Sequence, residues 1–330
     1  MRDVLRLPKA HLHLHLEGSA RPTTIQELAR REGIPLPTLT KPRFADFADF
    51  DTSLDAATRV LTRPTDLARI CRELVEDEAA DGVVYTEPMI SPHHHAERFA
   101  WSPEDVLRLM HEAFEEASAT TGVQVGLMIG IVRSWATEVA EEVARFAAEN
   151  RRHGVVALGL AGAGLASHEE HERFATACSI ARSADLTIVP HAGLLEGAAN
   201  VRRALEVLAP KRIAHGVRAA EDPSVLKRLA EGRVVCDVCP SAEVGLGIFP
   251  DLSQVPVPKM LGAGVPVTLN ADDPLLFGSS IAREYALART ALGLSDHELA
   301  LIARYSIEAS HLEASARQHH IAGIETWLAA

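Results

Sequence analysis

The sequence of 330 residues predicts one (β/α)8 barrel of the TIM type, with a helical insertion after its first strand. Two observations support this fold class. Eight apolar runs of strand length recur along the chain, and amphipathic helical patterns separate them without a linker-like break. Several runs are almost continuously hydrophobic, as expected of parallel strands covered on both faces. We expect the strands at residues 9–16, 82–88, 124–131, 154–161, 186–191, 211–216, 233–238 and 265–271.

A doubly wound open sheet is the alternative architecture, but no G-x-G-x-x-G turn follows an early strand to support it. The connection at residues 17–81 is much longer than an ordinary βα unit and should hold extra helices. In a barrel, an insertion after the first strand lies over the catalytic face. Phe44, Phe47 and Phe50 therefore either form part of a lid or pack the insertion onto the barrel.

The composition is that of an ordinary globular protein, with 47% hydrophobic and 24% charged residues. The net charge of −12 argues against nucleic acid or an anionic membrane as partner, because both require clustered Lys and Arg. A small-molecule partner is not excluded. Signal-peptide and membrane-spanning patterns are absent, so we expect a soluble cytoplasmic protein. Its four cysteines, including Cys236 and Cys239, are expected to be buried reduced thiols.

Alternating histidines, His11, His13 and His15, occupy the first expected strand. Side chains two positions apart point to the same side of a strand, so we expect the three imidazoles on one face. A barrel interior is normally filled by Val, Ile and Leu, and buried imidazoles there need partners. His13 and His15 lie nearest the carboxyl end of the strand and predict a metal site. The alternative is histidines that hydrogen-bond to neighbouring groups.

More candidate ligands stand at the ends of other expected strands. His191, His215 and the pair Asp272 and Asp273 each close an apolar run. In a barrel, all carboxyl ends of the strands meet at one rim. Three imidazoles and one carboxylate around an ion, with a position open for water, are typical of a catalytic site. The placement predicts one mononuclear metal-dependent hydrolase site.

Two other histidine clusters are expected to have no part in this site. The run His93-His94-His95 has the composition of a solvated loop. The histidines of His168-Glu169-Glu170-His171 are three apart rather than four, so the H-E-x-x-H motif is not present. We expect Glu169 and Glu170 in the charged first turn of a helix.

With these residues, the chain resembles the adenosine deaminase family of the amidohydrolase superfamily. The matching segments follow the order and spacing of the family, which makes the resemblance specific, and weaker similarity spans nearly the whole chain. The segments are Leu7-Pro8-Lys9, His13-Leu14-His15-Leu16-Glu17-Gly18, Leu160-Ala161-Gly162, His191-Ala192-Gly193, His215-Gly216 and Leu269-Asn270-Ala271-Asp272-Asp273-Pro274. The resemblance implies a barrel of the metal-dependent hydrolase type. It also implies hydrolytic deamination of an adenine-type nucleoside or related amino-purine, with release of ammonia.

The resemblance implies one Zn²⁺, or another divalent transition metal, as cofactor. It would be held by four ligands: His13, His15, His191 and Asp272. His215 would orient the attacking hydroxide and stabilise the developing charge, while Asp272 helps to move the proton.

The resemblance also implies three groups that bind the substrate. Asp273 would hydrogen-bond the purine ring at N7, and Gly162 would offer its backbone to N3. Glu17 would stand where the acidic residue of the family meets a ribose hydroxyl.

Leu194 departs from the pattern of the family. Members carry a glutamate directly after His-Ala-Gly, and this glutamate protonates N1 as hydroxide adds to C6. Leucine neither donates nor accepts a proton, and a lost general acid typically costs ~10²–10⁴-fold in rate. Glu196, two residues further on, or a water would then have to replace it.

Three hypotheses follow from the presence of all four expected metal ligands and the absence of the glutamate that acts as general acid in the family. The first is hydrolytic deamination of an adenine-type substrate. The second keeps the metal but changes the C–N substrate, so that the leaving group needs no protonation at N1 and Leu194 packs against an apolar substrate face. The third is a non-catalytic paralogue that binds a nucleoside or a metal without turnover.

Overall fold

The computed structural model describes residues 2–162 and 169–330. Within these residues, nine parallel strands form the sheet, in the order β1-β2-β4-β5-β6-β7-β8-β9 with β3 paired to β2. The strands are β1 (Lys9–His15), β2 (Val83–Ile90), β3 (Gln124–Val125), β4 (Leu127–Val132), β5 (Val155–Ala161), β6 (Thr187–Ala192), β7 (Arg212–His215), β8 (Val235–Val238) and β9 (Val267–Leu269).

The two ends of this strand order meet and close the barrel. The N–H of His15 donates to the carbonyl of Asp272 at 3.0 Å, and the N–H of Asp272 donates to the carbonyl of His13 at 3.1 Å. These bonds form a parallel bridge between Leu14 and Asp272. The expected (β/α)8 barrel is therefore confirmed.

The third expected strand, 124–131, is divided into β3 and β4 at Gly126. A Cβ on Gly126 would lie 2.2 Å from the hydroxyl oxygen of Tyr85, so only glycine allows the backbone to approach β2 so closely. The other expected strands match the structure to within a few residues.

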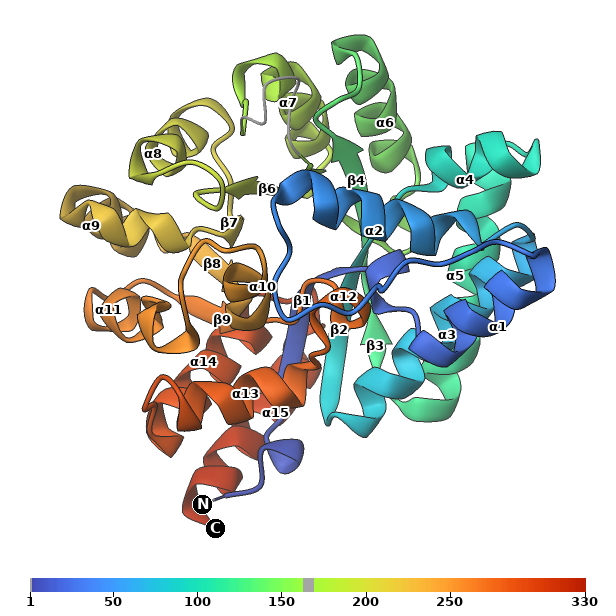
Figure 1. Ribbon diagram of the computed structural model, residues 1–330. Coiled ribbons are helices and arrows are strands. Elements are labelled where there is room, and N and C mark those ends of the chain that lie inside the picture. Colours follow the sequence, from blue (N-terminus) through green and yellow to red (C-terminus); the bar gives the residue numbers. More distant parts are fainter. Residues whose placement is uncertain (1, 163–168) are drawn as a thin grey trace.

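Helices surround the sheet (Figure 1). Those that follow the strands around the barrel are α3 (Pro64–Ala80), α5 (Pro103–Thr121), α6 (Thr137–Glu149), α7 (Ala175–Ser183), α8 (Ala198–Val207), α9 (Pro223–Gly232), α11 (Val257–Gly262) and α14 (Asp296–Ala309). Shorter or peripheral helices are α4 (Pro92–Phe99), α10 (Pro240–Gly245), α12 (Pro274–Phe277), α13 (Ile281–Thr290) and α15 (Ala314–Ala329). Among the described helices, none combines the length and apolarity that crossing a membrane requires.

Helix α5 illustrates why these segments are helical. Ser102 accepts the N–H of Asp105 through its side chain at 3.1 Å, and Pro103 occupies the first turn, where a missing N–H costs nothing. Gly122 ends the helix in the left-handed conformation, with φ of 80°. The buried face of α5 then packs into the large core between the helices and the sheet.

A separate small apolar cluster is contributed by five neighbouring strands. Its members are Met89, Met128, Ala157, Val189 and Ala214. They belong to β2, β4, β5, β6 and β7, and they pack inside the barrel beneath the carboxyl ends of these strands.

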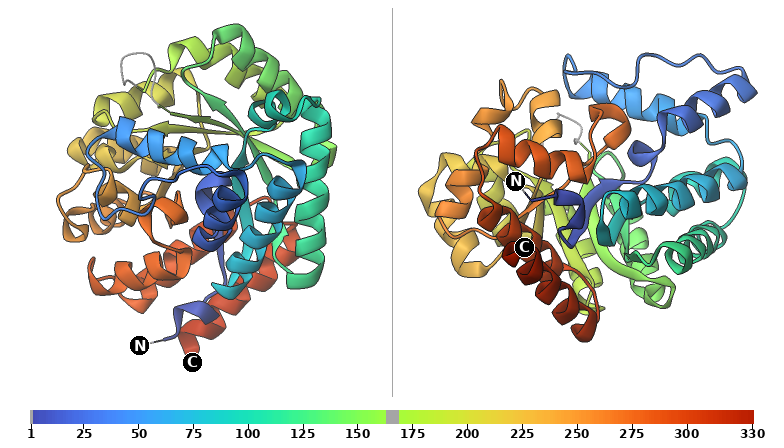
Figure 2. Two further views of the ribbon diagram at one scale, coloured as in Figure 1. Left: turned by 45° about the vertical axis from the view of Figure 1, so that its right-hand side comes forward. Right: turned by 90° about the horizontal axis from the view of Figure 1, so that it is seen from below.

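Residues 17–63, before α3, form η2 (Glu17–Ser19), α1 (Pro22–Glu32) and α2 (Phe47–Arg59). Helix α2 crosses in front of the strands in Figure 1, and the right view of Figure 2 shows α1 and α2 to one side of the barrel. Phe50 stacks on Phe277 of α12 at 5.6 Å between ring centroids, and Phe44 contacts both rings. Phe47 and Phe50 also line the main cavity, so these aromatic residues both pack the segment and cover the cavity.

Candidate active site

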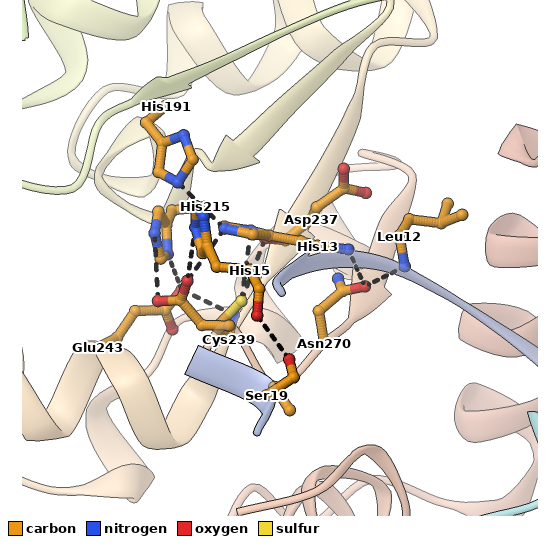
Figure 3. A network of polar contacts seen from close by, with 12 residues as sticks. Leu12, His13, His15, Ser19, His191, His215, Asp237, Cys239, Glu243 and Asn270 are labelled. Atoms are coloured by element: carbon orange, nitrogen blue, oxygen red, sulfur yellow. Dashed lines mark hydrogen bonds and ion pairs between the residues drawn. The ribbon is translucent and has the colours of Figure 1, made fainter. Parts of the chain in front are cut away.

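Three histidines lie close together at the carboxyl ends of the strands (Figure 3), and one aspartate joins them. His13 and His15 end β1, His191 ends β6, and Asp272 follows β9. Their candidate ligand atoms all lie within 4.8 Å of one another. Asp272 Oδ1 is 3.3 Å from Nε2 of His13 and 3.3 Å from Nε2 of His15. The structure therefore brings together the four side chains that were expected as ligands.

The hydrogen bonds of two of these imidazoles indicate what the cluster binds. Nδ1 of His13 lies 3.1 Å from the carbonyl oxygen of Asp237, and Nδ1 of His191 lies 3.0 Å from that of Leu160. A carbonyl only accepts, so both Nδ1 atoms carry a hydrogen, and each imidazole keeps a lone pair on Nε2 when it is neutral. These Nε2 atoms face each other at 3.1 Å, so a proton or a metal ion has to lie between them. The donor set fits a divalent metal ion such as Zn²⁺.

The protonation states at the cluster agree with this fit. Burial alone would raise the pKa of Asp272, but His13, His15 and His215 lower it well below its usual range. Burial, with the charges of the neighbouring histidines, lowers the pKa of His191 well below its usual value. An ionised carboxylate and a neutral imidazole are the forms that bind metal ions.

His215, at the end of β7, approaches the same cluster. Its Nδ1 lies 3.3 Å from Oε1 of Glu243 in α10, and its Nε2 lies 3.8 Å from Oδ2 of Asp272. Burial lowers the pKa of His215, but the hydrogen bond with Glu243 and the charge of Asp272 outweigh it and raise the pKa. His215 and Asp272 have φ of 66° and 59°, in the left-handed region, and such backbone strain clusters at functional sites.

Buried polar contacts hold β1 in place beside the cluster. The side-chain oxygen of Asn270 accepts the N–H groups of Leu12 at 2.9 Å and His13 at 3.1 Å. His11 does not join the other histidines, because the pairing of β1 shifts register after it. Instead, its Nδ1 is 2.8 Å from Glu78 of α3 and its Nε2 accepts the N–H of Ala271 at 2.9 Å. His11 therefore supports the backbone next to Asp272.

A cavity of about 370 Å³ opens above the metal-ligand cluster. His15, His191, His215 and Asp272 line it from the barrel side, and Leu54 of α2 is among the residues that line it from the insertion. The four residues expected to contact the substrate also line it: Glu17, Gly162, Leu194 and Asp273.

Asp273 presents a carboxyl group without a hydrogen-bond partner among the described residues, although it is 1% exposed. Burial raises the pKa of Asp273, and the charge of Asp272 raises it further while His15 opposes the shift. Gly18 makes room for it, since a Cβ there would lie 1.7 Å from Oδ1 of Asp273. A buried, protonated carboxyl group of this kind is able to donate a hydrogen bond to a ligand.

The prediction of a solvated loop at His93-His94-His95 is wrong. These residues lie in α4, and His95 is completely buried. Its Nε2 lies 2.7 Å from Oε1 of Glu17, whereas its Nδ1 has no partner among the described residues and so keeps the lone pair. Burial raises the pKa of Glu17, but the bond from His95 outweighs this effect and lowers it. His95 thus holds the Glu17 carboxylate at the cavity.

The prediction that Glu169 lies in the first turn of a helix is also wrong. The first helical residue of this region is Glu172, in η4 (Glu172–Phe174), and His168 lies outside the described residues. Glu169 is instead buried and accepts four backbone N–H groups of the loop after β6. Their distances are 2.9 Å for Gly193, 3.1 Å for Leu194, 3.3 Å for Leu195 and 3.2 Å for Glu196.

The side chains of Leu194 and Glu196, both in the loop after β6, line two different hollows. Leu194 is 4% exposed and lines the main cavity. Glu196 lines a second hollow, on the side of His171 and Arg203, and its Oε2 accepts from Nδ2 of Asn200 at 2.6 Å. Glu196 is not among the described residues that line the main cavity.

Arg133, which directly follows β4, holds the ends of β5 and β6 and lines the cavity. It is buried, and its guanidinium donates to the carbonyl oxygens of Gly162 at 3.0 Å and His191 at 2.5 Å. Burial lowers the pKa of Arg133 to about 10. Sequence reasoning did not select Arg133, Glu243, Glu169 or His95. The only signal was a charged residue or histidine at or soon after a strand end.

A cluster of imidazoles and a carboxylate at the carboxyl ends of the strands of a barrel is the arrangement expected of a metal-dependent hydrolase. The sequence profile of the adenosine deaminase family matches residues 8–327. A relative from Streptomyces coelicolor, provisionally named adenosine/adenine deaminase, is 40% identical over 347 residues, which cover 100% of this chain and 99% of the relative. An adenine deaminase from Chelativorans sp. is 38% identical and covers 94% of this chain and 96% of its own.

The solved structure of an adenine deaminase from Arthrobacter aurescens superimposes with a TM-score of 0.90 at 30% identity, over 98% of this chain and 100% of that one. The chain therefore belongs to the adenosine deaminase family. The resemblance is confirmed, and so is the expectation of a hydrolytic deaminase.

Proposed function

We propose that this protein removes the amino group of an adenine-type base or nucleoside with one Zn²⁺, releasing ammonia. The observation that carries the proposal is the pair of Nε2 atoms of His13 and His191, which face each other at 3.1 Å in a buried site and need a cation between them. The ion would be held by these two residues together with His15 and Asp272. When bound, it would lower the pKa of a water to about 7 and so provide a nucleophile at neutral pH.

Asp272 and His215 both line the cavity, so an attacking water bound at the metal would lie beside them. The Asp272 carboxylate is ionised and accepts the proton of the attacking water. Glu243 favours the doubly protonated form of His215, so Nε2 of His215 donates a hydrogen bond to the oxygen as charge develops on it.

Three further groups would orient the ring and its substituent. The carboxyl group of Asp273 is held in its protonated form and donates to a ring nitrogen, N7 in a purine. Gly162 offers its backbone N–H to N3, and Glu17 accepts a hydrogen bond from a hydroxyl of the substituent on the ring. The support for these roles is that all three groups line the cavity above the metal-ligand cluster.

The proton that N1 requires has a less obvious source. Glu196 was one candidate, but its bond to Asn200 holds it at the second hollow. We infer that a water supplies this proton when the substrate is a neutral ring. Such a water would meet Leu194 rather than a glutamate.

The test is a substrate screen on protein of measured metal content. Protein that holds one zinc per chain should release ammonia from adenine or adenosine, and removal of the metal by a chelator should abolish the release. Zinc added back should restore it. A zinc-loaded protein that releases no ammonia from any amino-purine would contradict the proposal and favour the non-catalytic paralogue.

A further inference from the structure

The cavity wall formed by Leu194 and Leu195 is apolar at the place where the reaction of a neutral ring needs a proton. Both leucines line the cavity, three and four positions after the ligand His191. When water adds to the amino-bearing carbon of a neutral ring, an electron pair moves onto the adjacent ring nitrogen. That nitrogen must then be protonated, and a hydrocarbon side chain cannot do so.

The loop after β6 is fixed in this arrangement. Gly193 has φ of 68°, and a Cβ there would lie 2.3 Å from Cγ2 of Val201, so the turn depends on glycine. The carboxylate of Glu169 holds the next residues by accepting their N–H groups with both of its oxygens. Glu169 also lines the cavity, but a carboxylate engaged as an acceptor in this way does not donate a proton.

The charge of the cavity favours a positively charged ligand. Among its described lining residues, six are carboxylic acids: Glu17, Asp51, Asp55, Glu169, Asp272 and Asp273. The only Lys or Arg side chain among these lining residues is Arg133, which donates to backbone carbonyls. Glu17, Asp51, Asp55 and Glu169 leave a net negative charge in the cavity, even when Asp272 is paired with a metal ion and Arg133 is counted. Phe47, Phe50 and Trp135 add aromatic faces, which attract cations.

We propose that the preferred substrate is an adenine-type ring that already carries an alkyl group, and a positive charge, on the ring nitrogen beside the amino-bearing carbon. In a purine this is a 1-alkyladenine, as free base or nucleoside, whose alkyl group packs against Leu194. The inference rests on the proposed function and names the substrate class for the same site.

The reaction of such a ring balances without an added acid. The oxygen of water bonds to the amino-bearing carbon, and the bond from this carbon to the exocyclic nitrogen breaks. The ring loses its positive charge. The exocyclic NH2 group takes both hydrogens of the water and leaves as ammonium. The products are a neutral 1-alkyl-6-oxopurine and ammonium, and neither an oxidant nor a reductant is consumed.

Two effects set the expected preference. A neutral ring without its general acid reacts ~10²–10⁴-fold more slowly, whereas the alkylated cation avoids this loss. Contact of one methyl group with an apolar wall adds about fourfold in binding. We therefore expect a preference for the 1-methylated ring of about 10²-fold or more.

The test compares adenine, 1-methyladenine and N6-methyladenine, and their nucleosides, with zinc-loaded protein at neutral pH. Chromatography measures the oxopurine product. The two methylated isomers have the same formula, but the 1-methyl isomer is by far the stronger base and carries the larger cationic fraction at this pH. The proposal expects kcat/KM for 1-methyladenine to exceed that for adenine and for N6-methyladenine by about 10²-fold. Adenine or the N6-methyl isomer reacting as fast or faster would overturn it while leaving the proposed function intact.

A substitution at the wall should reverse the preference. Leu194→Glu should raise kcat/KM for adenine and lower it for 1-methyladenine. Leu301→Glu is the matched control at a 39% exposed leucine of α14, and it should leave the ratio unchanged. An unchanged ratio in folded Leu194→Glu would overturn the proposal.

Binding provides a readout that needs neither turnover nor folding of the variant. Calorimetry on metal-free wild-type protein should show 1-methyladenine binding at least about tenfold more tightly than adenine, with the difference shrinking as salt is added. Equal affinities would overturn the proposal. No product from any of the compounds would instead overturn the proposed function itself.

Discussion

The metal floor (His13, His15, His191 and Asp272) and the leucine wall (Leu194 and Leu195) border one cavity, yet they differ in what they offer a substrate. The floor consists of polar groups whose hydrogen bonds and protonation states suit a cation. The wall consists of hydrocarbon, and Glu169 fixes its backbone. The groups that would prepare a water are therefore present in the floor, whereas neither leucine of the wall can supply the ring proton.

This difference shows that the two halves of a hydrolytic deamination are separable in structure. Attack requires the floor, and protonation of the ring requires a donor on the wall. A protein can therefore keep its reaction type by keeping the floor and change its substrate by changing the wall.

The largest effect is expected from Asp272→Asn in the floor. The substitution keeps the volume but removes the charge that two imidazoles face. We expect zinc affinity to fall by more than about 10²-fold, since even loss of a partner of a ligand costs 10–100-fold, and ammonia release to become undetectable. Metal content after dialysis measures the first effect. Asp185→Asn, at an 88% exposed carboxylate, is the control, and full zinc retention in Asp272→Asn would contradict the assignment.

The next effect is expected from Glu169→Gln beneath the wall. An amide presents one acceptor oxygen and an NH2 group, so part of the loop N–H groups would lose their acceptor. We expect a loss of about 1–3 kcal/mol in the free energy of unfolding, measured with urea, and faster amide exchange in residues 193–196. Glu170→Gln changes the adjacent surface ion pair with Arg173 and should have little effect. Unchanged exchange in Glu169→Gln would show that the loop does not depend on this carboxylate.

A smaller and selective effect is expected from His95→Leu, outside both regions. Without the donor at 2.7 Å, the carboxylate of Glu17 loses its fixed position. We expect KM for a nucleoside to rise about tenfold, with KM for the free base unchanged. His95→Gln keeps a donor and should restore part of the affinity. His93→Leu, on the same helix but packed on Phe146, should change neither KM, and an equal rise for base and nucleoside would argue for a merely structural role of His95.

The smallest effect is expected from Glu196→Gln. Asn200 holds this side chain at the second hollow, so the substitution should change kcat/KM by less than about twofold. Kinetics with adenine measures the change. A loss approaching ~10²-fold would identify Glu196 as the missing general acid and would break the contrast between floor and wall.

Much of the fold and the residues of the floor could be predicted from the sequence, because both depend on local patterns of residues. Continuous apolar runs reveal parallel strands, and polar residues at their ends reveal the ligands. His11 was expected to share a face with His13 and His15, but it does not. The register shift in β1 that separates them is set by pairing with β2 and not by the sequence of β1 alone.

The buried residues that support the site could not be predicted from such local patterns. Burial of His95 depends on how α4 packs beside η2, and a run of three histidines in the sequence does not indicate this packing. Glu169 binds backbone N–H groups, which every residue possesses, so no side-chain pattern marks its partners. His95 was predicted to lie in a solvated loop and Glu169 in the charged first turn of a helix, because polar side chains are mostly exposed.

The closing bridge of the barrel has a consequence for how the protein responds to metal. The hydrogen bonds that join the first strand to the last run through His15, His13 and Asp272, which are also the expected ligands. Occupancy of the site and integrity of the seam are therefore linked equilibria, and zinc concentration becomes a determinant of stability. The amide hydrogens of His15 and Asp272 would then act as an internal gauge of metal loading, since their exchange with solvent slows as the seam is held shut.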